Sequence, residues 1–373
     1  MRVAIFSNHK YDQDSFEEAN RSFKHDLVFL TAPLESATAS LAAGFTAVCV
    51  FVNDRLDAPV LAQIAKGGTK FVALRCAGYN NVDLRAAGAH GITVARVPAY
   101  SPYAVAEFTV GILLALVRQI CRGWLRVRGN NFSLEGLVGR DLHGKTVGVI
   151  GTGQIGALVA KAFKLGFGCD VVAHDVYRNP ELARIGVRYV GLEELLRRGD
   201  IICLHCPLAP QTRHLINEKT LVLAKPGFLL VNTSRGALVD TRALIDALKN
   251  GKVGGVAMDV YEQESDLFFE DLSNEVVEDD VFQRLLTFPN VIVTGHQAFF
   301  TREALTAIAQ TTLQNIADLE AGRPDPARLV KARTCPSRER AAVPDMAASS
   351  SLKAIMDGPA DEVIDLVKAN LRR

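Results

Sequence analysis

The sequence predicts an α/β protein with two domains, each built on a doubly wound parallel sheet. Three observations predict this fold class. The 373 residues exceed the roughly 100–200 residues of a single domain. Short apolar runs alternate with helix-like stretches, and a proline-containing break separates two such series. With 49% apolar residues and a formal net charge of +1, the chain has the composition of a globular protein and not of a disordered one.

The first series of strands occupies the first hundred residues, with strands expected over 3–7, 26–30, 47–52, 71–75 and 92–97. The run 47–52 contains no polar residue, which is typical of a strand buried on both faces of a parallel sheet. A helix is expected over 57–66, because leucine and isoleucine recur there at helical spacing and Gly67-Gly68 ends it.

The second series begins after Pro98 and Pro102, which interrupt the pattern and mark a candidate hinge. An apolar helix is expected over 104–118, and further strands over 146–150, 170–174, 201–205, 227–232, 256–258 and 291–294, followed by a helix over 302–320. Six strands that alternate with helices predict a doubly wound sheet. Residues 333–373 are expected to be a tail, made of a linker and a short amphipathic helix.

Composition also excludes several classes of partner. The 42 basic residues against 41 acidic ones argue against nucleic-acid binding, which needs a basic surface. The most apolar helical run, 110–117, is far shorter than the ~20 residues that span a bilayer, and the first ten residues contain no signal-peptide core. Seven scattered cysteines favour reduced thiols in a cytoplasmic protein with no membrane partner.

A glycine-rich motif joins the first strand of the second series to a helix expected over 157–165. In this motif Gly151 permits a tight turn, Gly153 lets the backbone approach a pyrophosphate, and Gly156 packs the helix against the strand. The helix N-terminus would offer free N–H groups and a partial positive charge to the anion. Taken alone, the pattern is also compatible with an ordinary glycine-rich turn.

An acidic residue at the right distance favours the dinucleotide interpretation. Asp175 follows Gly156 by 19 residues, at the end of the next strand, where the fingerprint places an acid that binds the ribose hydroxyls. A carboxylate there would repel a 2′-phosphate, so NAD is expected and NADP is the less favoured alternative. Arg178 would offset part of that repulsion.

Three ionisable residues follow later strands of the second series: Arg235, Glu264 and His296. Each has an ordinary interpretation as a surface arginine, a solvated acid or a structural histidine. Together they suit the reduction of a 2-keto acid. Arg235 would bind the substrate carboxylate, and His296 would donate a proton to the carbonyl oxygen while Glu264 favours the imidazolium form.

At these motifs the chain resembles the D-isomer-specific 2-hydroxyacid dehydrogenases, over about residues 1–330. The resemblance rests on the glycine motif with Asp175 and on segments 232–236, 258–262 and 295–298. Within that family, segments 74–83, 96–100 and 266–271 resemble the fermentative D-lactate dehydrogenases.

The resemblance implies a flavodoxin-like catalytic domain, 1–100 with 298–332, and an inserted Rossmann coenzyme domain, 101–297, with the substrate in a cleft between them. It assigns the catalytic roles to Arg235, Glu264 and His296. It assigns substrate contacts to Ala77, Gly78 and Tyr100. It places the nucleotide on Gly151, Gly153, Gln154, Ile155, Gly156, Asp175, Cys206, Pro207, Thr212, Thr233 and Asp259. Homodimers are common in the family, with the coenzyme domains and the helix expected over 104–118 at the interface.

Three functions remain open at this point. The first is the reduction of pyruvate to D-lactate by NADH. The second is the same chemistry on a larger aryl or branched-chain 2-keto acid, if Tyr100 and Phe299 leave room. The third is a dinucleotide-sensing protein that resembles a co-repressor. No metal site is expected, because Cys203 and Cys206 lack the second cysteine pair of a Cys₄ site.

Overall fold

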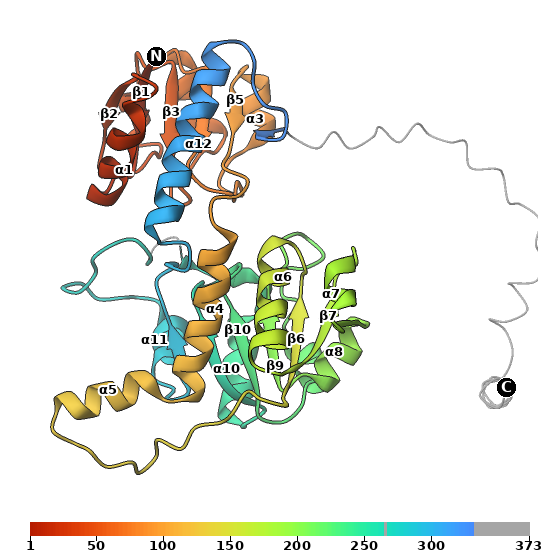
Figure 1. The fold of residues 1–373 in the computed structure, drawn as a ribbon. Helices are drawn as coiled ribbons and strands as arrows, with labels where there is room; N and C mark the ends of the chain where they lie inside the picture. Colours follow the sequence, from red (N-terminus) through yellow and green to blue (C-terminus); the bar gives the residue numbers. More distant parts are fainter. Residues whose placement is uncertain (265–266, 332–373) are drawn as a thin grey trace, which may run out of the picture. The chain divides into compact units, whose positions relative to one another are not determined.

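The computed structural model describes residues 1–264 and 267–331, which form two mainly parallel sheets with helices on both faces (Figure 1). The chain builds five strands of the first sheet, passes into the second sheet, and returns to add one last strand to the first. The predicted fold class is therefore confirmed. The exact domain limits, 1–100 with 298–332 and 101–297, stay a prediction, and the tail over 333–373 lies outside the described residues.

The first sheet has the strand order of a flavodoxin-like fold. Its order is β13-β5-β4-β3-β1-β2, and all neighbours are parallel except β13 and β5. The strands are β1 (Arg2–Ile5), β2 (Asp26–Phe29), β3 (Ala47–Val50), β4 (Phe71–Leu74), β5 (Thr93–Ala95) and β13 (Leu329–Val330). One hydrophobic cluster joins α1 (Lys10–Asn20) and α12 (Arg302–Glu320) to one face of this sheet. Another joins α2 (Ala58–Lys66) and α3 (Leu84–Ala89) to the opposite face.

The second sheet has the Rossmann order with a seventh strand added, β12-β11-β10-β9-β6-β7-β8. Its strands are β6 (Thr146–Ile150), β7 (Asp170–His174), β8 (Arg188–Tyr189), β9 (Ile201–Leu204), β10 (Phe228–Asn232), β11 (Val253–Met258) and β12 (Val291–Val293). Residues of α4 (Pro102–Val117) and α6 (Gln154–Lys161) form a core with one face. The other face packs against α8 (Leu192–Arg198), α9 (Glu218–Leu223), α10 (Thr241–Lys249) and α11 (Asp280–Leu286).

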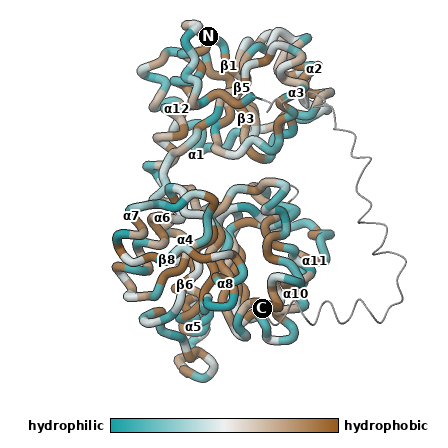
Figure 2. The backbone as a smooth tube through the Cα atoms, turned by 90° about the vertical axis from the view of Figure 1, so that its right-hand side faces the viewer, coloured by the Kyte–Doolittle hydropathy of each residue, from teal (hydrophilic) through white to brown (hydrophobic). Residues whose placement is uncertain are grey.

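Local sequence signals explain where the helices begin. The Asp57 side chain accepts from the Val60 N–H and caps α2, and Ser101 caps α4 just before Pro102 at its first position. Thr301 caps α12 in the same way. Most residues of the central strands are apolar and buried, in keeping with the brown segments near β1, β3 and β5 in Figure 2, because both faces of each sheet are covered.

The structure differs from the predicted elements at several places. Two-residue strands such as β8 and β13 are too short to give a periodic pattern, and α5 (Ile120–Arg128) was not predicted either. The helix α6 begins at Gln154 instead of 157. The strand β11 begins at Val253 instead of 256, because it includes Gly254 and Gly255, residues that usually weaken a strand.

No single helix within the described ranges is long and apolar enough to cross a membrane. The helices α4 and α5 pass that test only when taken together, and they are bent by 62° at the break between them.

Candidate functional site

The glycine motif forms a tight turn between β6 and α6. Gly151 has a φ of +91°, and a Cβ there would lie 2.6 Å from the Cys206 nitrogen. A Cβ on Gly156 would lie 1.9 Å from the Gly151 carbonyl oxygen, so the helix contacts the strand end directly. By contrast, nothing lies within 4 Å of a Cβ built on Gly153. The open space at Gly153, the N-cap of α6, fits the approach of a dinucleotide pyrophosphate.

Asp175 is placed at the end of β7, beside this turn. Its carboxylate accepts hydrogen bonds from the Thr152 N–H (2.5 Å), the Thr152 hydroxyl (3.0 Å) and the Tyr177 N–H (3.1 Å). Partial burial opposes the charged form, but these hydrogen bonds outweigh it and lower the pKa of Asp175 below its usual value. A negative charge is therefore fixed where the ribose of a dinucleotide would lie.

Four other predicted nucleotide positions, Cys206, Pro207, Thr212 and Thr233, lie on the loops that follow β9 and β10. The Cys206 carbonyl accepts from the Ser234 hydroxyl at 2.8 Å, and Thr233 shares a 2.8 Å hydrogen bond with Thr109 of α4. Thr212 donates to the Pro207 carbonyl at 2.7 Å, so its hydroxyl is used within its own loop. Gln154 and Ile155 open α6.

His205 is a polar group in this region that the sequence interpretation passed over. Its side chain is partly buried, burial lowers its pKa to about 4, and its buried Nε2 atom has no partner in the described structure. It lines the same small cavity as Thr233 and Ser234. An unpaired buried nitrogen there is consistent with a bound polar group, which supports a ligand at this strand edge.

Arg235 lies on the loop after β10 of the second sheet, and Gly78 lies on the loop after β4 of the first. The two residues are in contact. A Cβ on Gly78 would lie 2.7 Å from Nη2 of Arg235, so only glycine lets the guanidinium approach this closely. Arg235 donates one hydrogen bond to the Ser234 carbonyl at 2.6 Å and forms no ion pair within residues 1–264 and 267–331. In the same ranges the amide N–H groups of Ala77 and Gly78 have no acceptor. The arrangement is thus open to a carboxylate.

His296 and Glu264 form the pair that the sequence predicted. His296 Nδ1 lies 2.9 Å from Glu264 Oε1, and both side chains are mostly buried. The second oxygen of Glu264 accepts from the Tyr261 N–H at 2.9 Å. Because Nδ1 is engaged by the carboxylate, the Nε2 nitrogen of His296 is the one left for a substrate.

Asp259 holds the loop that carries His296. Its carboxylate accepts from the N–H groups of Gln297 (2.9 Å) and Ala298 (2.7 Å) and from the Thr294 hydroxyl (2.6 Å). Burial raises the pKa of Asp259, while these hydrogen bonds act in the opposite direction. The structure therefore places this predicted nucleotide residue under the histidine loop, at the edge of the cavity.

A small cavity of about 70 Å³ lies between these groups, lined by Tyr100, Val105, Ile155, His205, Thr233, Ser234, Arg235, Asp259, His296, Ala298 and Phe299. Aromatic rings narrow the cavity. Phe299 packs edge-on against Tyr100 and against His296, with ring centroids 6.0 Å and 6.5 Å apart. Burial raises the pKa of Tyr100 to about 12, which keeps its hydroxyl neutral. Pockets for drug-sized ligands are several times larger, ~300–1,000 Å³.

Phe51 and Phe269 extend this aromatic wall and were not predicted. The ring centroid of Phe51 lies 5.1 Å from that of Phe269 and 6.0 Å from that of Phe299. The ring centroids of Phe269 and His296 are 5.8 Å apart. In the sequence Phe51 lies within the apolar run 47–52 and looks like any core residue. The signal that identifies it comes only from the tertiary structure.

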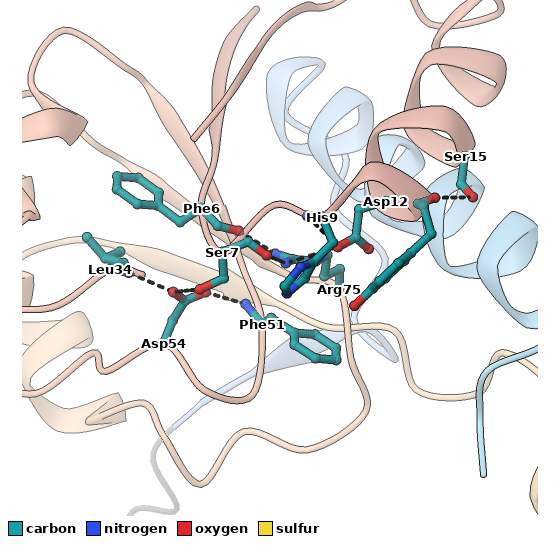
Figure 3. Close-up of polar contacts among 10 residues, drawn as sticks. Phe6, Ser7, His9, Asp12, Ser15, Leu34, Phe51, Asp54 and Arg75 are labelled. Atoms are coloured by element: carbon teal, nitrogen blue, oxygen red, sulfur yellow. Dashed lines mark hydrogen bonds and ion pairs between the residues drawn. The ribbon is translucent and has the colours of Figure 1, made fainter. Parts of the chain in front are cut away.

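A buried ionic cluster surrounds Arg75, which precedes Ala77 by two residues in the chain (Figure 3). Arg75 is 1% exposed and donates to the carbonyls of Phe6 (2.9 Å) and Ser7 (2.7 Å), and its guanidinium lies 4.9 Å from the centre of the Phe51 ring. Asp54 accepts from the Ser7 hydroxyl at 2.7 Å. The cluster therefore joins the ends of β1, β3 and β4.

Metal ligands are not gathered anywhere in the described ranges, where no group of three or more His, Cys, Asp or Glu residues could hold an ion. Among residues 1–264 and 267–331 the free cysteines are Cys49, Cys76, Cys121, Cys169, Cys203 and Cys206. Burial raises the pKa of the Cys206 thiol to about 11, which makes it a packing residue and not a reactive thiolate.

Comparisons with known proteins agree with this geometry. Residues 110–298 match the family described as "D-isomer specific 2-hydroxyacid dehydrogenase, NAD binding domain". The chain is 56% identical to 2-hydroxyacid dehydrogenase homolog 1 of Schizosaccharomyces pombe, over 89% of this chain and 100% of that protein. It is 52% identical to the D-lactate dehydrogenase of Escherichia coli, over 88% of this chain and 100% of that protein.

A solved structure gives the same result. The pyruvate reductase of Chlamydomonas reinhardtii superposes with a TM-score of 0.82 at 46% identity, covering 87% of this chain and 97% of that one. The glycine motif, Asp175 and the matched segment together identify NAD as the cofactor. The chain belongs to the D-isomer-specific 2-hydroxyacid dehydrogenase family, close to its D-lactate dehydrogenases, and is an NAD-dependent oxidoreductase.

Proposed function

We propose that the protein reduces pyruvate to D-lactate with NADH. The observation that carries the proposal is the convergence of Arg235, the His296–Glu264 pair and an aromatic wall on one cavity of about 70 Å³. A 2-keto acid needs a cation for its carboxylate and a proton donor for its carbonyl oxygen, and these residues supply both.

Each side chain has a separate role in the proposed reaction. Arg235, with the open amides of Ala77 and Gly78, binds the substrate carboxylate and orients the keto group. His296 donates a proton from Nε2 to the carbonyl oxygen, and Glu264 stabilises the imidazolium through Nδ1. A bound NADH would supply the hydride that C2 of the substrate accepts. The surrounding apolar rings exclude water, which strengthens these charged contacts.

The size of the cavity supports a small substrate. Tyr100 and Phe299 narrow the space next to His296, which disfavours the aryl and branched-chain 2-keto acids considered above. The names of two relatives point the same way, since one is a D-lactate dehydrogenase and another a pyruvate reductase. We therefore place pyruvate ahead of larger keto acids.

The remaining assignments are also part of the proposal. The dinucleotide lies along α6 and the loops after β7, β9, β10 and β11, on Gly151, Gly153, Gln154, Ile155, Gly156, Asp175, Cys206, Pro207, Thr212, Thr233 and Asp259. Residues 101–297 act as the coenzyme domain, and 1–100 with 298–332 as the catalytic domain. We place the enzyme in the cytoplasm, without nucleic-acid or membrane partners.

We further propose that the enzyme is a homodimer. The helix α5 has no buried residue, and the exposed fractions of Ile120, Trp124 and Leu125 are 54%, 58% and 61%. The loop after it exposes Phe132 (71%) and Leu134 (81%). Apolar surface of this kind is typical of a protein–protein interface, and a second copy of the chain is the occupant that the family resemblance supports.

The test is NADH oxidation at 340 nm with a panel of 2-keto acids, followed by chiral analysis of the product. We expect the highest kcat/KM for pyruvate and a product that is D-lactate. A preference for an aryl or branched-chain keto acid would replace the substrate and keep the chemistry. Tight NADH binding without turnover of any keto acid would instead favour the dinucleotide-sensing function.

A further inference from the structure

A second histidine–carboxylate pair lies beside the proposed catalytic residues. His214 Nε2 is 2.5 Å from Glu262 Oε1, and Arg213 Nη2 is 3.7 Å from the same oxygen. The two paired side chains are partly buried, with exposed fractions of 34% for His214 and 19% for Glu262. The proposed reaction uses neither residue, so the pair needs another explanation.

The second carboxylate oxygen of Glu262 reaches a different element. Glu262 Oε2 accepts from the Thr241 hydroxyl at 3.2 Å and from the Thr241 N–H at 3.4 Å, at the first residue of α10. One carboxylate therefore joins three segments: the loop after β9, the start of α10 and the segment after β11. Hydrogen bonds to a charged group are stronger than those between neutral groups.

The loop that carries His214 is the one proposed to hold the nucleotide. It begins with Cys206 and includes Pro207 and Thr212. His214 has a φ of +50°, and its backbone is fixed on both sides: its N–H donates to the Ala237 carbonyl at 2.9 Å, and its carbonyl accepts from the Asn217 side chain at 2.7 Å. A shift of the His214 ring would therefore be transmitted to this loop.

The segment that carries Glu262 leads directly to the acid–base pair. A Cβ on Gly236 would lie 1.9 Å from the Tyr261 carbonyl oxygen and 2.4 Å from the Glu262 nitrogen, so this backbone packs against the residue that follows Arg235. The Tyr261 N–H then donates to Glu264, which binds His296. Any displacement of Glu262 would move the carboxylate that orients the histidine.

We infer that His214 and Glu262 are positioning residues that clamp the nucleotide loop to segment 261–264. The clamp couples dinucleotide binding to the orientation of Glu264 against His296. It acts through the backbone and touches neither substrate nor cofactor. The inference rests on the proposed function for the meaning of that orientation, but the coupling to NADH binding can be measured by itself.

The test is a double-mutant cycle with Glu262→Gln, His214→Asn and the double variant. Glutamine keeps the size of the side chain and removes its charge, and asparagine tolerates a positive φ. NADH affinity is measured by fluorescence titration, and kcat and KM are measured with pyruvate. We expect each single change to lower kcat and NADH affinity about tenfold, with KM for pyruvate changed less than about threefold, and the double variant to match the worse single one.

The matched control is Glu193→Gln, which breaks the exposed Glu193–Arg197 pair at 3.2 Å in α8 and is expected to change nothing. Melting temperatures separate the clamp from a merely structural role, which would lower stability and leave kcat and NADH affinity per folded molecule intact. That result, or additive effects in the cycle, overturns the inference. If the wild type binds NADH and reduces no keto acid, the proposed function fails, and the NADH titrations still decide the clamp.

Discussion

At His296 the backbone adopts a left-handed conformation, with a φ of +54°. Such a conformation is uncommon for a residue other than glycine. Here Asp259 maintains it, because its backbone carbonyl accepts from the His296 N–H at 2.7 Å and its carboxylate holds the next two N–H groups. In this conformation the imidazole contacts Glu264 and lines the cavity.

Replacing His296 with alanine tests the proton-donor role. We expect kcat with pyruvate to fall by at least ~10²-fold, because proton donation contributes about this much to such reactions. NADH affinity is expected to stay near the wild-type value, since the histidine belongs to the substrate side. Stopped-flow or steady-state rates with a fluorescence titration check both expectations, and near-normal turnover would remove His296 from the mechanism.

Gly78→Ala tests the approach of Arg235 to the substrate loop. The new Cβ would lie 2.7 Å from Nη2 of Arg235, so the guanidinium must move and kcat/KM for pyruvate is expected to fall about tenfold or more. The control is Gly88→Ala in α3, where nothing lies within 4 Å of the added Cβ. The control is expected to keep full activity and to gain up to about 1 kcal/mol of stability. Equal kinetics for the two variants would contradict the close approach.

At the scale of elements, the buried cluster around Arg75 binds three strand ends of the first sheet together. Arg75→Met would leave the carboxylates of Asp12 and Asp54 buried without their cation. Losing one partner of a buried ion pair costs about 3–5 kcal/mol of unfolding free energy. Urea unfolding measures the loss, and Arg55→Met, which breaks the largely exposed pair with Asp57, is expected to cost less than about 1 kcal/mol.

The amino ends of strands in the second sheet meet at Asp200, which accepts from Lys225 Nζ and from the Thr146 N–H, both at 2.8 Å. Partial burial opposes its charge, but these contacts prevail and lower the pKa of Asp200 from the usual 3.8. Because the pKa is lower in the folded state, the Asp200 carboxylate adds to the unfolding free energy above pH 3.8, the ordinary pKa. This contribution is lost as the pH falls below that value. Asp200→Asn is therefore expected to reduce the loss of unfolding free energy at acidic pH. Urea unfolding at several pH values measures this loss. Asp246→Asn, a change at a 73% exposed side chain, should leave it unchanged, and an unaltered loss in Asp200→Asn would contradict the argument.

How far the sequence predicts these elements depends on what forms them. Strands such as β6 and β7 were predicted to the residue, because short runs rich in valine and other apolar residues are a local signal. The start of β11 was missed because Gly254 looks like a strand breaker. In the structure a Cβ there would lie 2.3 Å from the Gly227 carbonyl, so glycine is required by a neighbour that is distant in sequence.

The residues of the candidate site also form two groups, those that the sequence predicts and those that only the structure reveals. Arg235, Glu264 and His296 could be proposed from their places after strands, and the structure brings each beside the cavity or its paired residue. Phe51, Phe269 and the His214–Glu262 pair could not, since their significance arises only from contacts between distant segments. Sequence patterns thus identify the chemistry, while the tertiary structure identifies what limits and orients it.

At the scale of the whole molecule, the exposed apolar surface of α5 and its following loop predicts how copies associate. Trp124 is 58% exposed, and Arg128 lies over its ring at 4.8 Å. Trp124→Glu would place a charge within the proposed interface, where a buried, unpaired carboxylate costs several kcal/mol. We expect this variant to be a monomer at micromolar concentration, while the wild type is a dimer.

Size-exclusion chromatography with light scattering measures both masses. The matched control is Val222→Glu on α9, a change at a residue that is 71% exposed and lies outside the proposed interface, and it should remain a dimer. If dissociation leaves kcat intact, each protomer holds a complete site, as the cavity built from a single chain implies. A wild-type monomer, or a Trp124→Glu dimer, would show that the α5 surface serves a different contact.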